Sequence, residues 1–196
     1  MIREIIDYII PDIEALNFSE VVGGVAVPIT HKIMSGDKTT NKTFPAYKKS
    51  QDMCGTGDYI SLVPDSSKRS VIYFEDLGST IVNETSDFLD MSARVKLIWW
   101  LNMKLINEAV NPVDIVKLLL NVFPKYIQSV GTSCKIFIYP QSQDQKSAAI
   151  FNRYTYDETM KQYLMYPFDY GAMTFEIRYS VGKSCQQQIA INPSIC

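Results

Sequence analysis

The sequence predicts an α+β fold with a mainly antiparallel sheet, and three observations support this. Residues 89–105 alternate between apolar and polar side chains, and residues 172–185 alternate again. Residues 2–16 and 112–128 instead repeat apolar side chains every three or four positions. A period of two is typical of a strand with one buried face, and the longer spacing is typical of an amphipathic helix. We expect one very long strand at about 89–105, packed by an N-terminal helix and by a helix at about 112–128.

The composition is that of a folded domain with no general attraction for nucleic acid. The chain has 196 residues, of which 46% are hydrophobic and 12% aromatic, and its formal net charge is −2. Enough apolar side chains are present for a core, whereas a basic surface would have to be local. We expect a single domain over residues 1–196. No apolar window is long enough to span a membrane, so we expect no membrane association.

Residues that carry chemistry are few and do not follow known motifs. His31 is the only histidine, and "CGTGDY" and "VGTSCK" lack the spacing of nucleotide-binding loops. The cysteines stand far apart without a C-x-x-C pair, which favours free thiols in a reducing cytoplasm. These cysteines are Cys54, Cys134, Cys185 and Cys196. We expect no catalytic residue, no cofactor and no metal ligand, and therefore no enzymatic activity.

The N-terminal segment predicts a helix followed by a turn. Isoleucines recur along one face of residues 2–16, while Pro11 should break or kink the helix near Ile10. The plain interpretation is a helix packed on a sheet, and the alternative is a helix that docks on a partner. The glycines of "VVGGVAVP" (21–28) indicate a turn leading into a short strand.

Residues 30–58 are polar, poor in aliphatic side chains and rich in lysine, which predicts a long loop or arm. Loops longer than about 12–15 residues are usually functional or disordered. The plain interpretation is a solvated insertion, and the alternative is an arm that contacts a neighbouring subunit or a nucleic acid backbone. The candidate contact residues are Lys32, Lys38, Lys42, Lys48 and Lys49.

The remaining segments complete the sheet. Residues 58–76 predict two short strands around a turn at Pro64-Asp65-Ser66-Ser67, and "CKIFIYPQ" after Gly131 predicts another strand. Asn111 and Pro112 suit the N-cap and first position of the second helix. The tyrosine-rich residues 148–168 are ambiguous between helix and strand.

The long strand has two unusual properties. Seventeen extended residues span roughly 56 Å, whereas a domain of this size is about 40 Å across. The strand should therefore bend, contain a bulge or extend beyond the domain. Ile98 and Trp100 also lie on the otherwise polar face, so something must cover that face locally. Either a lid from the same chain covers them, or they form a subunit interface.

The order of elements resembles the tail-terminator, tail-completion and neck-ring proteins of tailed bacteriophages. The stretches that carry the resemblance are "DMSARVKLIWWLNMKL", "NPVDIVKLLLNVFP" and "MTFEIRYSVGKSC". The resemblance implies a small α+β domain that assembles into a homo-oligomeric ring, a hexamer or larger, and catalyses nothing. It implies contacts with neighbouring head or tail proteins and a place in the virion, after assembly in the cytoplasm of the bacterial host. The long strand and the arm would be subunit contacts, with arm lysines near DNA in the channel.

A second hypothesis is an intracellular module without catalytic activity that binds a peptide or a small ligand. Its binding surface would use Trp99, Trp100 and the tyrosine-rich segment. A monomer with a deep apolar pocket near Trp100 would favour this hypothesis over the ring.

Overall fold

The computed structural model confirms the α+β class with a mainly antiparallel sheet. It describes residues 2–35, 38–48, 59–107, 111–123, 136–155 and 161–182. The strands are β1 (Val21–Val25), β2 (Val27–Ser35), β3 (Lys38–Lys48), β4 (Tyr59–Ser61), β5 (Ser70–Glu84), β6 (Phe88–Asn102), β7 (Ile136–Gln145) and β8 (Phe168–Gly182). The helices are α1 (Ile2–Glu14), α2 (Met103–Ile106) and α3 (Pro112–Leu120), with 3-10 helices at Ala148–Phe151 and Gln162–Leu164.

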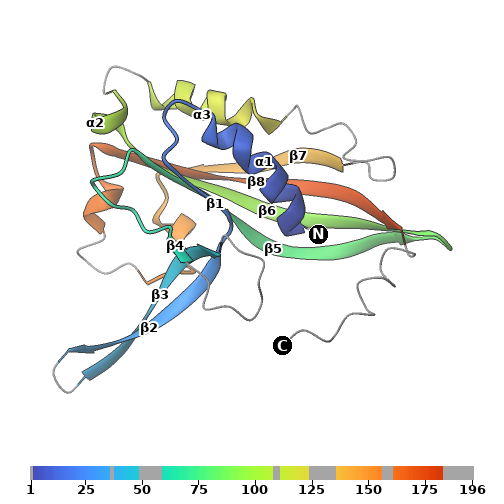
Figure 1. The fold of residues 1–196 in the computed structure, drawn as a ribbon, viewed down its shortest axis with the longest axis horizontal. Helices are drawn as coiled ribbons and strands as arrows, with labels where there is room; N and C mark the ends of the chain where they lie inside the picture. Colours follow the sequence, from blue (N-terminus) through green and yellow to red (C-terminus); the bar gives the residue numbers. More distant parts are fainter. Residues whose placement is uncertain are drawn as a thin grey trace.

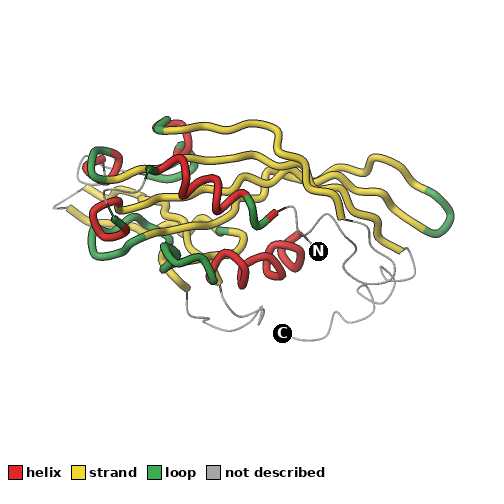
Figure 2. Tube along the Cα trace, turned by 90° about the horizontal axis from the view of Figure 1, so that it is seen from above, coloured by secondary structure: helices red, strands yellow, loops and turns green. Residues whose placement is uncertain are grey.

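The larger sheet has five strands in the order β1-β5-β6-β8-β7. β1 runs parallel to β5, and every other neighbouring pair is antiparallel. α1 and α3 lie on one face of this sheet (Figures 1 and 2). Just after α3, Phe123 stacks on Phe175 of β8 with ring centroids 4.5 Å apart, and meets Phe74 of β5 edge-on. The main core therefore lies between these two helices and the sheet.

The central strand β6 has the two faces that its alternation predicts. Leu97, Trp99 and Leu101 are buried on the helix side. Residues 92, 94 and 96 face the other way and keep contact with solvent. The strand ends at Asn102, three residues before the predicted end, and Met103 begins the short helix α2. Its partner β8 starts opposite Asn102, and Pro167 before it has no N–H, so the ladder cannot continue.

The length of the strand pair β5–β6 is accommodated by bulges and by projection. The register between them shifts at Asp76/Ser79 and again at Ile81/Asn83. Beyond these shifts the β5–β6 hairpin runs past α1 and leaves the body of the molecule (Figures 1 and 2). The strand was predicted to bend, to contain a bulge or to extend beyond the domain, and the strand pair shows both bulges and extension (Figure 1).

α1 forms as predicted, but Pro11 does not end it. The helix continues to Glu14, and the N–H of Ala15 donates to the Pro11 carbonyl oxygen at 3.0 Å. A proline inside a helix costs about 3 kcal/mol. Burial of each large aliphatic side chain contributes roughly 1.5–3 kcal/mol, and α1 buries four isoleucines. These are Ile6, Ile9, Ile10 and Ile13. Packing on the sheet therefore outweighs the lost hydrogen bond.

The predicted loop at 30–58 is instead largely a β-hairpin. β2 and β3 pair without interruption from Val27↔Ala46 to Ser35↔Lys38, and β4 adds a third strand to this smaller sheet. Threonine and isoleucine recur along both strands, and β-branched side chains favour extended backbone. Much of this hairpin faces water on both sides, so its side chains are polar and rich in lysine, as in a loop. Residues 49–58 lie outside the described residues.

The glycines of "VVGGVAVP" lie inside strand β1 and do not form the predicted turn. Their role is close approach between elements. A Cβ on Gly24 would come within 2.6 Å of the Tyr47 ring and 2.8 Å of an Asp7 carboxylate oxygen. A Cβ on Gly23 would come within 2.8 Å of Leu62. The two glycines thus let the smaller sheet and α1 pack directly on the backbone of β1.

α3 begins where it was predicted to begin, but it is shorter than predicted. The Asn111 side-chain oxygen accepts a hydrogen bond from the N–H of Val113 at 3.0 Å, and Pro112 is the first helical residue. The helix ends at Leu120, before the predicted end at about 128. Residues 124–128 lie outside the described part of the chain.

The other segments have the predicted type of secondary structure, but some differ from the prediction in length. β4 and β5 flank the predicted turn, but β5 is not short, since it continues past residue 76 to Glu84. β7 and β8 form where strands were predicted. The ambiguous segment 148–168 is mostly 3-10 helix and turn where it is described, and it covers one end of the polar face of the large sheet.

Candidate functional site

The predicted lid or interface at Ile98 and Trp100 is a lid from the same chain. Ile98 is 0% exposed and Trp100 is 1% exposed. The Trp100 indole N–H donates to the Tyr163 carbonyl oxygen at 2.7 Å, and its ring stacks on Phe168 with centroids 5.0 Å apart. Side chains sealed in this way offer no surface to another subunit. The prediction that they form a subunit interface is therefore wrong, and they belong to the core.

The predicted arm lysines are spread over two faces of the β2–β3 hairpin. Lys32 is exposed on β2, and its register partner is Asn41. Lys42 and Lys48 lie on the opposite face of β3 and are half-buried. Lys38 begins β3, but its side chain lies outside the described residues, as does all of Lys49. Lys32, Lys42 and Lys48 therefore lie on two faces of a paired β-hairpin and not in a loop.

The hairpin is tied to the body at its base. The Tyr47 hydroxyl donates to an Asp7 carboxylate oxygen of α1 at 3.2 Å. Burial, followed by the neighbouring Asp7 carboxylate, raises the pKa of Tyr47. The backbone of Thr43 bonds Thr155 on both sides: its carbonyl oxygen accepts from the Thr155 N–H at 2.8 Å, and its N–H donates to the Thr155 hydroxyl at 3.3 Å. Beyond Thr43 the hairpin projects away from the body (Figure 1).

The β5–β6 hairpin is a second projection, and its side chains include apolar residues in water. Ile81 and Val82 are each 59% exposed, and Phe88 is 42% exposed. The bulge at its base is built by Gly78, whose φ is +108° and whose N–H donates to the Asp76 carboxylate at 2.8 Å. Glycine is favoured there because L side chains rarely adopt that backbone conformation.

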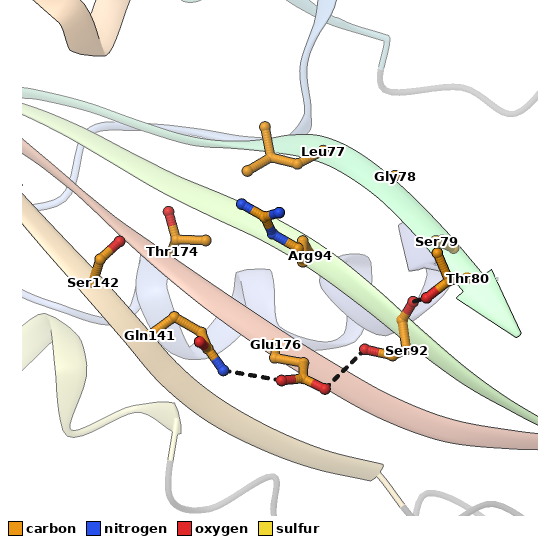
Figure 3. A pocket seen from close by; sticks show the side chains of 10 residues that line it. All are labelled: Leu77, Gly78, Ser79, Thr80, Ser92, Arg94, Gln141, Ser142, Thr174 and Glu176. Carbon is orange, nitrogen blue, oxygen red and sulfur yellow. Dashed lines mark hydrogen bonds between the residues drawn. The ribbon is translucent and has the colours of Figure 1, made fainter. Parts of the chain in front are cut away.

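A cavity of about 620 Å³ lies on the polar face of the large sheet, beside this bulge (Figure 3). β5, β6, β7 and β8 all contribute to it. The lining residues are Leu77, Gly78, Ser79, Thr80, Ser92, Arg94, Gln141, Ser142, Thr174 and Glu176. Its volume is in the range of small-molecule sites, about 300–1,000 Å³, but its lining is mainly polar.

Glu176 is held by several donors at the floor of this cavity. Its carboxylate accepts hydrogen bonds from Arg178 at 2.7 Å, from the Ser92 hydroxyl at 2.9 Å and from the Gln141 amide at 2.9 Å. The bonds from Arg178 and Ser92 hold the pKa of the Glu176 carboxyl below its usual value. Arg94 faces Glu176 directly in the register of β6 and β8. No hydrogen bond or ion pair joins the Arg94 side chain to any residue that the structure describes.

The buried carboxylate of Glu75 lies on the same face of the sheet, on β5 just before the residues that line the cavity. Glu75 is 1% exposed, and its Oε2 lies 3.7 Å from the Arg153 guanidinium. Its Oε1 has no hydrogen-bond partner within the described ranges. Lys96 stands opposite Glu75 in the register, but its ammonium donates to the Ile150 carbonyl oxygen at 3.1 Å.

The sequence indicated the polar face but not the cavity. Alternation placed Arg94, Thr174, Glu176 and Arg178 on wet faces of two strands. Their meeting depends on the register of β6 with β8, which no local pattern fixes because both strands are long and regular. The dipeptide Gly36-Asp37 between two β-branched runs was the signal for the β2–β3 hairpin.

Comparison of the chain with protein-family models and with curated proteins finds no match. Within the described residues, no helix is long and apolar enough to cross a membrane. In the same part of the chain, no three histidine, cysteine, aspartate or glutamate side chains gather where they could hold a metal ion. The four cysteines lie outside it.

Proposed function

We propose that this chain is a structural subunit that assembles with copies of itself into a ring, at the neck or tail end of a tailed bacteriophage, as a terminator or connector. The observation that carries the proposal is the unpaired outer edge of β5 in the projecting β5–β6 hairpin, where Leu77, Ile81 and Val82 are exposed. The place in the virion and the neighbouring head or tail proteins rest on the resemblance to tail-terminator and neck-ring proteins.

The outer edge of β5 is suited to pairing with another strand. β1 pairs with β5 only between Val71 and Phe74. From Asp76 to Glu84, no described strand pairs with this edge. Exposed edges of monomeric proteins are usually protected by lysine, proline, a bulge or a cover. "DLGSTIVNE" contains no lysine, arginine or proline, and its protection is limited to the two bulges at Asp76/Ser79 and Ile81/Asn83. Backbone pairing here would also cover Ile81 and Val82.

The β2–β3 hairpin presents a second edge with the opposite charge. Thr30 and Thr43 are register partners, and the backbone groups of Thr43 bond Thr155, not β2. In such a pair the N–H and C=O of Thr30 also point outward. This edge carries His31 and Lys32, whereas the β5 edge carries Asp76 and Glu84. In a ring around DNA, Lys32 would also bring positive charge near the channel.

Contact between the two different edges favours a ring over a symmetric dimer. A heterologous contact repeats from subunit to subunit and forms a ring when the rotation closes. Antiparallel pairing of two β5 edges about Thr80 would instead place Asp76 of each copy opposite Glu84 of the other. Like charges directly opposite each other destabilise a sheet.

The test measures mass against concentration. We expect light scattering of the full chain to show growth to a closed oligomer and negative-stain electron microscopy to show rings. Ile81→Lys/Val82→Lys should leave a monomer, because lysine on an edge opposes strand pairing. Val113→Lys is the matched control, since Val113 is an exposed apolar residue of α3. It should assemble like the wild type.

A strict monomer at high concentration would contradict the proposal. So would assembly that is lost equally in the double lysine variant and in the α3 control, because the contact would then not lie at the β5 edge. Circular dichroism of each variant confirms that the loss is not unfolding.

A second candidate is a module without catalytic activity that binds a peptide or a small ligand, and the cavity beside Gly78 favours it. The apolar pocket expected near Trp100 is replaced by packing against Phe168 and Tyr163. A monomer that binds a ligand on the polar face of the large sheet would favour this candidate over the ring.

A further inference from the structure

We propose that the cavity beside Gly78 binds a small oxyanion, a carboxylate or a phosphate, through the guanidinium of Arg94. The cavity itself does not require ring assembly, because every residue that lines it belongs to one chain. The ligand would bind on the polar face of the large sheet.

The first support is that the Arg94 side chain has no partner among the described residues, although the Glu176 carboxylate faces it in the register. Arg178, Ser92 and Gln141 occupy both oxygens of Glu176. Figure 3 shows the Glu176 carboxylate turned toward Ser92 and Gln141, and the Arg94 guanidinium pointing to the other side of the cavity. A planar guanidinium with free N–H groups matches the two oxygens of a carboxylate or phosphate.

The second support is a pair of hydroxyls on the side toward which Arg94 points. Thr174 and Ser142 are register partners on β8 and β7. Both hydroxyls lie on the Arg94 side of the cavity (Figure 3). A hydroxyl donates one hydrogen bond, so the two can add to the N–H groups of Arg94 around a single bound anion.

The third support is the balance of charge on this face. Arg178 pairs with Glu176, and Arg153 lies 3.7 Å from Glu75. These pairs leave Arg94 and Lys96 without a carboxylate partner among the described residues. Arg94 is therefore the unpaired positive charge that lines the cavity, whereas Lys96 lies outside its lining and the carboxylates of Asp90 and Asp144 lie further along the same face.

The experiment titrates the full chain with inorganic phosphate and, separately, with glutarate, at constant ionic strength set by chloride. Binding is followed by calorimetry and by amide shifts in NMR spectra. We expect saturable binding, with Arg94→Gln weakening it roughly tenfold or more, because a charge-assisted bond is lost. Thr174→Val should weaken it by roughly two- to tenfold.

Lys32→Gln is the matched control, since it removes the same charge from the arm, far from the cavity. It should bind both anions like the wild type. Arg94 is exposed, so Arg94→Gln should fold normally, and circular dichroism checks this. Failure of the wild type to saturate, equal binding by Arg94→Gln, or an equal loss in Lys32→Gln would each overturn the proposal.

A further arm of the experiment separates two sources of the anion. Phosphate is added to the assembled protein, and its mass is measured by light scattering. A fall in mass for the wild type identifies a carboxylate of a neighbouring copy as the occupant. An unchanged mass with saturable binding identifies a free anion.

Discussion

The adjacent tryptophans Trp99 and Trp100 serve opposite faces of one strand. Trp99 packs against β8 at Gly171, where a Cβ would come within 2.4 Å of the indole ring. Trp100 faces the other way and is closed off by Phe168 and Tyr163. Each indole therefore joins β6 to a different layer, and the strand is buried on both sides at this point. Ile98 and Trp100 interrupt the alternation because the same chain covers this end of the polar face.

We expect Trp100→Ala to destabilise the monomer and not merely its assembly. Replacing a buried tryptophan by alanine typically costs about 3–5 kcal/mol in the free energy of unfolding, and the bond to the Tyr163 carbonyl is also lost. Urea unfolding followed by circular dichroism measures the change. Tyr59→Ala is the control, since Tyr59 is half exposed at the start of β4, and it should change stability by less than about 1 kcal/mol. A Trp100→Ala monomer as stable as the wild type would show that the 161–168 segment does not seal this face.

At the scale of elements, Glu176 connects three strands of the large sheet. It lies on β8 and accepts hydrogen bonds from Ser92 of β6 and Gln141 of β7, as well as from Arg178 of its own strand. Side-chain bonds across strands add to backbone pairing and oppose a slip of register. This cluster therefore stabilises the sheet as it leaves the cover of the helices.

The stability contributed by Glu176 should depend on pH. Its pKa in the folded protein lies below the ordinary value of 4.5, because Arg178 and Ser92 hydrogen-bond the charged form. A depressed folded-state pKa gives a contribution that is present above the unfolded pKa and lost as the pH falls through the folded pKa. We expect the stability difference between wild type and Glu176→Gln to be largest above about pH 5 and to shrink below about pH 4.

Urea unfolding at a series of pH values measures this difference. Ser92→Ala removes one of the two donors that lower the pKa, so its pH dependence should lie between those of the wild type and Glu176→Gln. A wild-type advantage that stays constant down to the acid range would show that the Glu176 carboxyl is not held in its charged form by the fold.

A strand could be predicted from the sequence when one of its faces is buried in the core. β6 and β8 each bury a full face, so hydrophobic alternation identified them. β2 and β3 project into water over much of their length, so no apolar period marks them, and threonine content was the weaker signal. β5 was predicted too short for the same reason, since residues 77–84 are all exposed. The cavity depends on register and bulge, which arise from pairing of distant segments.

At the scale of the whole molecule, the two projecting hairpins leave the body on opposite sides (Figures 1 and 2). The β2 edge has outward backbone groups and basic side chains, and the β5 edge has outward apolar and acidic ones. A subunit with different, complementary edges at its two ends can add a neighbour at each end. Each end can then be blocked separately by mutation.

Mixing two blocked variants should give a dimer that cannot grow. Thr30→Pro removes the outward N–H of β2 without breaking its ladder to β3, because Thr30 and Thr43 do not share backbone hydrogen bonds. Ile81→Lys/Val82→Lys blocks the β5 edge. Each variant alone should be a monomer, whereas an equimolar mixture has one intact β2 edge and one intact β5 edge, so light scattering should show one-to-one heterodimers. A mixture that stays monomeric while wild type assembles would contradict pairing between β2 and β5, and growth of the mixture into full rings would show that one of the two edges is not part of the contact.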